Sequence, residues 1–225
     1  MNKEQEIVFR WLGTRDWGEA HALQLRIRDR VVLGASPGEV LMMEHPAVIT
    51  AGRQASRRDL QISAEALRAR GITFVQSERG GHLTLHLPGQ LVFYPIIPLQ
   101  SLRMGVNQYV RVLAETLVEW LSVHQLSGEW KDDAPGVWVG PNGSRKIASV
   151  GIHVHKQVPI HGASLNLSPD LALFQMLRPC GFSSNVMTSF EAEGGTSLSV
   201  EEAARQIAPV LAEKLGVKWG GFDSD

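Results

Sequence analysis

Residues 146–155 and 158–167 are two adjacent segments with the residue pattern of β-strands. In the first segment every second residue belongs to one row, and such a row lies on one face of a sheet. The row consists of Lys146, Ala148, Val150, Ile152 and Val154. A lysine that heads an apolar row is costly to bury unless its charge or its lone pair is used. The two segments therefore predict paired strands in a sheet, and they mark Lys146 as a candidate functional residue.

The rest of the chain has the pattern of short strands between separated helices. We expect strands at residues 6–12, 39–44, 72–75, 83–87, 91–99 and 136–139, with a less regular stretch at 45–54. We expect helices at residues 16–31, 63–71, 107–121, 170–177 and 199–215, the last one interrupted or kinked at Pro209. Turn residues predict two hairpins, one around Pro88-Gly89 and one at residues 141–143. This mixture predicts an α+β fold with a mixed, largely antiparallel sheet flanked by helices, in a single domain of residues 1–225.

The charge balance and the cysteine content exclude several functional classes. The net charge is −1, which argues against binding to nucleic acid or to an anionic membrane through bulk charge. The single cysteine cannot form an internal disulfide, and the first residues lack the apolar core of a signal peptide. No apolar run approaches the length that spans a membrane. We therefore expect a cytoplasmic protein that binds neither nucleic acid nor membranes.

The cysteine, Cys180, lies between Pro179 and Gly181, in a bend between predicted elements. Most free cysteines are small buried apolar residues, so packing alone is one explanation. Bends often carry function, however, and a nearby cation lowers the pKa of a thiol and supplies thiolate near neutral pH. Lys146 is the candidate cation, although a lysine at a strand edge can also extend into solvent. We predict that Lys146 and Cys180 meet in space as a nucleophile and its activator.

A glycine pair in residues 78–90 (ERGGHLTLHLPGQ) predicts a second part of the site. Glycines let the backbone come close to a ligand, although the same residues also suit a hairpin loop. Arg79 can bind a carboxylate, a phosphate or a neighbouring loop. His82 and His86 lie four residues apart on an expected strand, which is not a zinc-binding arrangement, so we expect no metal.

His161 is a further candidate because it lies between Lys146 and Cys180 in the sequence and precedes a glycine. The chain contains no Gly-x-Ser-x-Gly motif, no phosphate-binding Walker loop and no dinucleotide-binding fingerprint. On residue types alone, a cysteine hydrolase with His161 or His86 as its base stays open.

Four motifs, in order, span most of residues 39–190. They are residues 41–53 (LMMEHPAVITAGR); residues 79–84 (RGGHLT) with His86 and residues 88–95 (PGQLVFYP); residues 135–139 (PGVWV) with 146–151 (KIASVG); and residues 161–166 (HGASLN) leading into 179–181 (PCG). With a lysine and a cysteine in the expected places, the chain resembles the lipoyl(octanoyl) transferase family, the octanoyl-[acyl-carrier-protein]:protein N-octanoyltransferases of lipoate biosynthesis.

The resemblance implies the fold of the biotin/lipoate protein ligases and a reaction that needs neither ATP nor another cofactor. It implies transfer of an octanoyl group from acyl carrier protein to a lysine of a lipoyl domain, in 2-oxoacid dehydrogenases or in the glycine cleavage H protein. Cys180 would carry the acyl group as a thioester, Lys146 would tune its thiol, and backbone N–H groups near Gly80-Gly81 or Gly151 would stabilise the oxyanion. The substrate-binding residues of the family fall on Arg79, Gly80, Gly81, His82, Leu83, Thr84, Leu85, His86, Ser149, Val150, Gly151, His161, Gly162, Ala163 and Ser164.

Two positions depart from the family pattern. Leu85 stands where tyrosine is usual, which changes a pocket wall and affects acyl placement or chain-length preference. Leu87 stands where glycine is usual, which requires either a negative φ or a rearranged loop. Three other functions remain as alternatives: an ATP-dependent lipoate or biotin protein ligase, a non-catalytic module that binds acyl groups or lipoyl domains, and the cysteine hydrolase.

Overall fold

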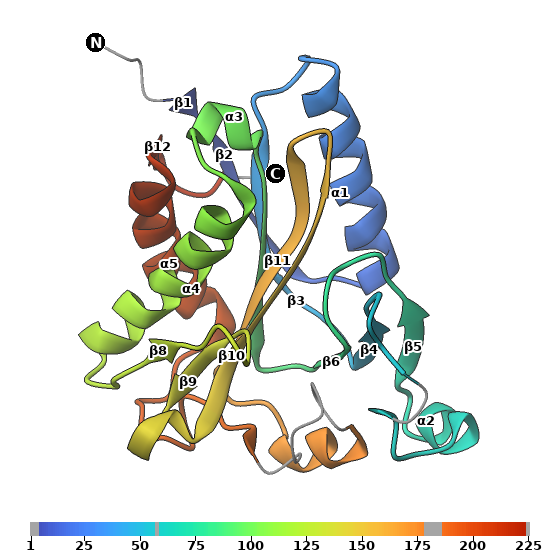
Figure 1. Cartoon of the computed structure of the whole chain (residues 1–225). Helices are drawn as coiled ribbons and strands as arrows, with labels where there is room; N and C mark the ends of the chain where they lie inside the picture. The colour runs from blue at the N-terminus through green and yellow to red at the C-terminus, as the bar shows by residue number, and fades with distance from the viewer. Residues whose placement is uncertain (1–4, 57–58, 178–185, 224–225) are drawn as a thin grey trace.

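The computed structural model of the protein describes residues 5–56, 59–177 and 186–223, and its largest feature is a sheet of seven strands (Figure 1). These strands follow the order β2 (Val8–Thr14), β3 (Glu39–Glu44), β7 (Gln90–Ile96), β11 (Val158–Asn166), β10 (Arg145–His155), β9 (Val137–Val139) and β8 (Glu129–Trp130). Strands β2 and β3 are parallel, and each of the other neighbouring pairs is antiparallel. The prediction of a mixed, largely antiparallel sheet is therefore confirmed.

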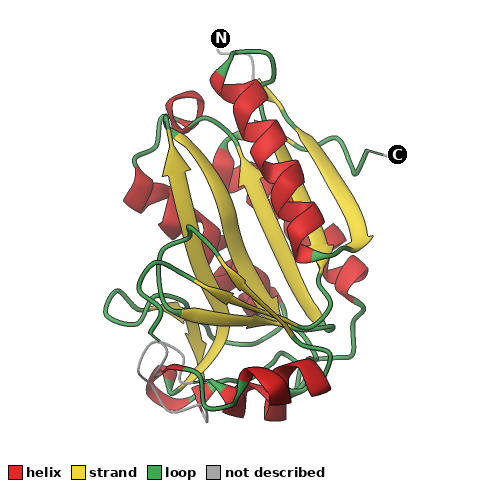
Figure 2. Ribbon diagram, turned by 90° about the vertical axis from the view of Figure 1, so that its right-hand side faces the viewer, coloured by secondary structure: helices red, strands yellow, loops and turns green. Residues whose placement is uncertain are grey.

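A second sheet has three strands in the order β5 (Thr73–Gln76), β4 (Val48–Ala51) and β6 (Leu83–His86). It packs with helix α2 (Ala64–Ala69) and the 3₁₀ helix η3 (Leu171–Met176) around an apolar core that includes Ile49, Leu85 and Phe174. Figure 2 shows this small sheet crossing the long strands of the large one. The space between the two sheets is where the predicted site residues gather.

Helices cover both faces of the large sheet (Figures 1 and 2). On one face, α4 (Val106–Val123) and α5 (Val200–Leu215) share an apolar core with strand residues such as Phe93 and Leu165. On the other face, α1 (Trp17–Val32) packs against β7 and β11. The remaining elements are short: β1 (Gln5–Glu6), β12 (Val217–Lys218), α3 (Leu99–Leu102) and the 3₁₀ helix η2 (Pro141–Gly143).

Local sequence signals place the ends of the main helices. Asp16 accepts hydrogen bonds from the N–H groups of Gly18 and Glu19 at the start of α1, and Ser199 with Glu202 forms a capping box at the start of α5. Helix α5 runs past Pro209 as one element, so of the predicted interruption or kink the interruption is wrong, and the kink stays a prediction. Among the described helices, none combines the length and the apolar character needed to cross a membrane.

The predicted hairpin around Pro88-Gly89 is wrong, because β6 and β7 belong to different sheets. The stretch at 45–54 contains a strand, β4, and β4 is the antiparallel partner of β6. The turn is instead fixed by long-range contacts, since the N–H of Gly89 donates to the Glu44 carboxylate at 2.6 Å and its carbonyl accepts from Leu167 at 3.0 Å. The φ of Gly89 is +87°, which suits glycine. Gly89 therefore joins the two sheets.

Candidate active site

A cavity of about 240 Å³ lies between the two sheets. The large sheet contributes polar residues, among them Lys146, Ser149 and Ser164, and the small sheet with η3 contributes an apolar wall. The apolar wall consists of Leu83, Leu85, Phe174, Leu177 and Met187. Further predicted residues that line this larger cavity are Arg79, Gly80, Gly81, His82, Thr84 and Val150.

A smaller cavity of about 40 Å³ shares Arg79, Thr84 and Ser149 with the larger one. The remaining predicted residues, His86, Gly151, His161, Gly162 and Ala163, line this smaller cavity. The fold thus brings together, around two adjoining cavities, every predicted site residue that lies in the described part of the chain. Cys180 lies outside the described residues.

Lys146 is buried, with 6% of its surface exposed. Its Nζ donates a hydrogen bond to the carbonyl of Pro135 at 2.6 Å and lies 5.8 Å from the centre of the Trp138 ring. The predicted row is wrong at this position, because the register shifts between Lys146 and Ala148. A shift of one residue reverses the faces of a strand, so Lys146 lines the larger cavity while Ala148 joins the apolar core.

The described residues on either side of positions 178–185 both lie at this cavity. Leu177 forms a bridge with Leu60, and Met187 forms a bridge with Lys146 itself. The N–H of Thr188 then donates to the Lys146 carbonyl at 3.0 Å. Leu177 and Met187 both line the larger cavity, so the described chain on each side of positions 178–185 reaches the cavity that Lys146 also lines.

Arg79 holds its own loop against strand β4, whereas the sequence predicted that it binds a carboxylate, a phosphate or a neighbouring loop. Its guanidinium donates to the Thr50 side chain at 3.0 Å, to the Thr50 carbonyl at 2.6 Å and to the His82 carbonyl at 2.7 Å. It also donates to the Gly80 carbonyl at 3.0 Å. The loop packs so closely on Gly52 that a Cβ there would lie 2.3 Å from the Gly81 carbonyl oxygen. Arg79 therefore shapes the glycine loop that lines the cavity.

The N–H of Gly80 is not available as an oxyanion donor, contrary to one sequence-based expectation. It donates to the carbonyl of Ile152 in β10 at 2.9 Å. This bond ties the glycine loop to the large sheet.

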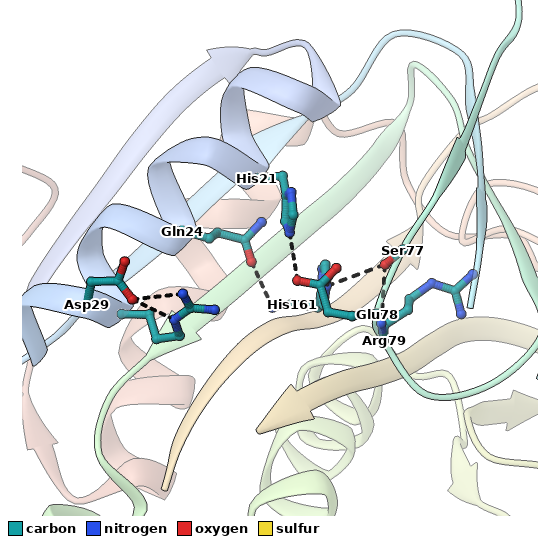
Figure 3. Close-up of polar contacts among 8 residues, drawn as sticks. His21, Gln24, Asp29, Ser77, Glu78, Arg79 and His161 are labelled. Atoms are coloured by element: carbon teal, nitrogen blue, oxygen red, sulfur yellow. Dashed lines mark hydrogen bonds and ion pairs between the residues drawn. The ribbon is translucent and has the colours of Figure 1, made fainter. Parts of the chain in front are cut away.

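Glu78 connects the glycine loop to α1 and β11, and sequence reasoning missed this contact (Figure 3). Its carboxylate accepts a hydrogen bond from His21 Nε2 at 2.8 Å, and His161 Nε2 lies 3.7 Å from its other oxygen. His161 and then His21 hold the pKa of Glu78 well below its ordinary value, against the opposing effect of burial. The contact joins residues that are distant in sequence, so no local pattern signals it.

The ligand atoms of His21, Glu78 and His161 all lie within 4.8 Å of one another, so their spacing could hold a metal ion. Two features favour a hydrogen-bonded bridge instead. The carboxylate already lies between the two imidazoles, and the cationic Arg79 is close enough to lower the pKa of His161. Burial is the main cause of that lowered pKa and keeps His161 neutral at pH 7.

The two leucines that depart from the family pattern are accommodated without backbone strain. Leu85 is buried and forms part of the apolar wall of the larger cavity. Leu87 is also buried, and it does not adopt the positive φ that would favour glycine. Of the two alternatives that the sequence left for Leu87, the structure therefore shows the negative φ.

With this geometry established, the sequence can be compared with those of known proteins. A family model described as the lipoyl protein ligase A/B catalytic domain matches residues 16–212. The chain belongs to this family. It is 38% identical over 205 residues to the octanoyltransferase of Maridesulfovibrio salexigens, covering 91% of this chain and 92% of that one. It is 37% identical over 214 residues to the octanoyltransferase of Mycobacterium tuberculosis, covering 95% and 89%.

Solved structures show the same fold as this member of the lipoyl protein ligase A/B family. A bi-partite lipoate protein ligase from Thermoplasma acidophilum matches with a TM-score of 0.72 at 16% identity, covering 98% of this chain and 87% of that one. Lipoate-protein ligase A bound with ATP matches with a TM-score of 0.71 at 14% identity, covering 99% and 89%. The biotin protein ligase from Aquifex aeolicus in complex with biotin and ATP gives 0.54 at 15% identity, covering 94% and 70%. The predicted biotin/lipoate protein ligase fold is therefore confirmed.

Proposed function

We propose that the protein transfers an octanoyl group from acyl carrier protein to a lysine of a lipoyl domain, through a thioester on Cys180 that Lys146 assists. The observation that carries this proposal is the larger cavity, where a buried lysine faces an apolar wall. Leu177 and Met187, on either side of positions 178–185, line the same cavity. Its polar and apolar sides suit the reacting thioester and the acyl tail of one substrate.

The first half-reaction would move the acyl group onto the enzyme. The Cys180 thiolate attacks the carbonyl carbon of the octanoyl thioester, and a new carbon–sulfur bond forms. The bond to the carrier sulfur then breaks, and the Lys146 ammonium gives a proton to that departing thiolate. This step leaves an acyl-enzyme, a free carrier thiol and a neutral Lys146.

The second half-reaction would form the amide. The neutral amine of the acceptor lysine attacks the acyl-enzyme carbonyl, and Cys180 leaves as a thiolate. Neutral Lys146 takes the proton that the attacking nitrogen loses and becomes an ammonium again. Because a thioester is exchanged first for a thioester and then for an amide, the two half-reactions run without ATP.

The volume of the larger cavity supports an acyl group of this size. A dry apolar cavity of about 150 Å³ holds benzene, which corresponds to about 25 Å³ for each non-hydrogen atom. On that scale the 240 Å³ cavity holds about ten non-hydrogen atoms, and an octanoyl group has about nine. The match supports a medium-length acyl chain.

The family comparison supports the choice of acceptor and donor. Relatives named octanoyltransferase match over 91–95% of this chain at 37–38% identity. A solved ligase of the same fold is described with its E2 lipoyl domain. We infer that lipoyl domains, of 2-oxoacid dehydrogenases or of the glycine cleavage H protein, accept the octanoyl group. The location of the protein in the cytoplasm stays a prediction.

Intact mass spectrometry after incubation with octanoyl-acyl carrier protein tests the proposal. We expect the enzyme to gain the mass of one octanoyl group, and we expect Cys180→Ser to gain none. With wild-type enzyme, a lipoyl domain should then receive the acyl group in the absence of ATP. Transfer that requires ATP and survives Cys180→Ser would contradict the proposal and favour a ligase. Binding of the acyl carrier protein without any transfer would favour a non-catalytic module.

A further inference from the structure

Lys146 lies in a narrow recess formed by the segment from Ala134 to Trp138. The Pro135 carbonyl accepts the hydrogen bond from its Nζ at 2.6 Å, and the Trp138 ring lies 5.8 Å from the same nitrogen. The indole of Trp138 is itself held, because its Nε1 donates to the Ala134 carbonyl at 2.7 Å. The recess therefore offers an ammonium a carbonyl oxygen and the face of an aromatic ring, both of which favour a positive charge.

Gly136 lies at the closest point of this recess. A Cβ at this position would lie 2.3 Å from Lys146 Cε and 3.0 Å from Lys146 Nζ. It would also lie 2.6 Å from the carbonyl oxygen of Ala148, so the backbone of β10 leaves it no room to move away. The φ of Gly136 is +148°, a conformation that residues with a Cβ rarely adopt.

The recess stands opposite the register shift in β10. Lys146 pairs with Trp138 and Ala148 pairs with Val137, and the shift falls between them. The shift turns Lys146 away from the apolar core and toward the cavity, and the missing side chain at Gly136 provides the space into which it turns. The register shift in β10 and the glycine that precedes β9 thus together set the position of the Lys146 side chain.

We propose that Gly136 is a positioning residue for the transfer reaction, because only a residue without a side chain leaves Lys146 in its recess between the Pro135 carbonyl and the Trp138 ring. The proposal rests on the proposed function, in which Lys146 moves protons at the reacting sulfur and nitrogen. A side chain at position 136 displaces the lysine head from both partners. The lysine then becomes more accessible to solvent and less able to deliver its proton.

A matched pair of variants tests this proposal. Gly136→Ala places its Cβ against Lys146, whereas Gly140→Ala, in the same β9–β10 hairpin, places its Cβ 2.6 Å from Arg145 Nη2 instead. Gly140 has a φ of +79°, so both variants strain the backbone, but only the first touches Lys146. Circular dichroism establishes that each variant is folded before its activity is compared.

The first measurement is the acetylation rate of individual lysines, read by peptide mass spectrometry, and it does not depend on the reaction mechanism. In the wild type, Lys146 is 6% exposed, so its acetylation should be roughly tenfold or more slower than that of the exposed Lys156. In Gly136→Ala the rate at Lys146 should approach the rate at Lys156, and in Gly140→Ala it should stay low. Equal rates at Lys146 and Lys156 in the wild type would overturn the proposal even if Gly136→Ala does not fold.

The second measurement is the rate and pH profile of acyl-enzyme formation. Gly136→Ala should slow this step about 100-fold and change its pH profile as Lys146→Ala does, whereas Gly140→Ala should keep the wild-type profile. If Lys146→Ala slows the step and Gly136→Ala behaves like Gly140→Ala, the positioning role of Gly136 is wrong. If Lys146→Ala itself leaves the step unchanged, the role of Lys146 in the proposed function is wrong, and the acetylation rates still decide the position of the lysine.

Discussion

The apolar wall of the larger cavity predicts that Phe174 limits the length of the acyl chain. Phe174 belongs to η3, is 3% exposed, and lines the cavity together with Leu85. Phe174→Ala removes about six carbon atoms, which is the size of a benzene molecule and opens about 150 Å³ if the wall does not collapse. The room then rises from about ten to about sixteen non-hydrogen atoms, enough for an acyl chain of about twelve to fourteen carbons.

The expected preference between acyl chains of different length follows from the free energy of burying each methylene group. Burial of one methylene contributes about 0.8 kcal/mol, which changes a rate or binding ratio about fourfold. The wild type should therefore prefer octanoyl over hexanoyl about fifteenfold and should transfer dodecanoyl poorly. In Phe174→Ala, four more methylenes find room, so dodecanoyl should become the better substrate by up to about 3 kcal/mol. Partial collapse of the wall reduces this value.

The assay compares acyl-enzyme formation from hexanoyl, octanoyl, decanoyl and dodecanoyl carrier proteins by intact mass. Leu67→Ala is the matched control, because Leu67 is buried in the same apolar core but does not line the larger cavity. Both variants lose stability, about 3–5 kcal/mol for Phe174→Ala and about 2–5 kcal/mol for Leu67→Ala. Only Phe174→Ala should shift the chain-length profile. A folded Phe174→Ala variant with the wild-type profile would refute the assignment of this wall to the acyl tail.

Two further predictions concern stability. Burial lowers the pKa of His45, His86 and His161, so the unfolded chain binds more protons below pH 6.5. The free energy of unfolding should therefore fall on acidification, by up to about 1.4 kcal/mol per pH unit for each imidazole that stays neutral, and the urea midpoint should fall with it. A midpoint that stays constant between pH 7.5 and pH 5 would contradict this. Gly89→Ala should cost about 1–3 kcal/mol, because the φ is +87° and a Cβ would lie 2.8 Å from Ser168. Gly194→Ala, with the same φ and open space around it, is the control, and equal losses in the two variants would rule out a role for the close approach.

The sequence predicted most of the elements because their signals are local. Asp16 and Ser199 cap α1 and α5, and residues 146–155 and 158–167 form the antiparallel pair β10 and β11. The sheet to which a strand belongs is not a local property. Strand β4 is buried along its whole length and shows no alternation, so its pairing with β6 was missed and a hairpin was predicted in its place.

In the candidate site, too, some features have local sequence signals and others depend on how the chain folds. The motifs contain most of the predicted residues that line the two cavities. The face of Lys146 depends on a register shift, and the contact of Glu78 with His21 depends on how α1 packs, and neither leaves a local pattern. The meeting of Lys146 with Cys180 stays a prediction, as does the extent of the domain over residues 1–225.

The junction at Gly89 has a consequence for how such enzymes diversify. Lys146 lies on the large sheet, Leu83 and Leu85 of the apolar wall lie on the small sheet, and the chain passes between the two sheets at this glycine. Mutations can change the apolar wall, as Leu85 illustrates, and leave Lys146 in place. A common ancestor could thus give rise to descendants with new tail preferences and unchanged chemistry.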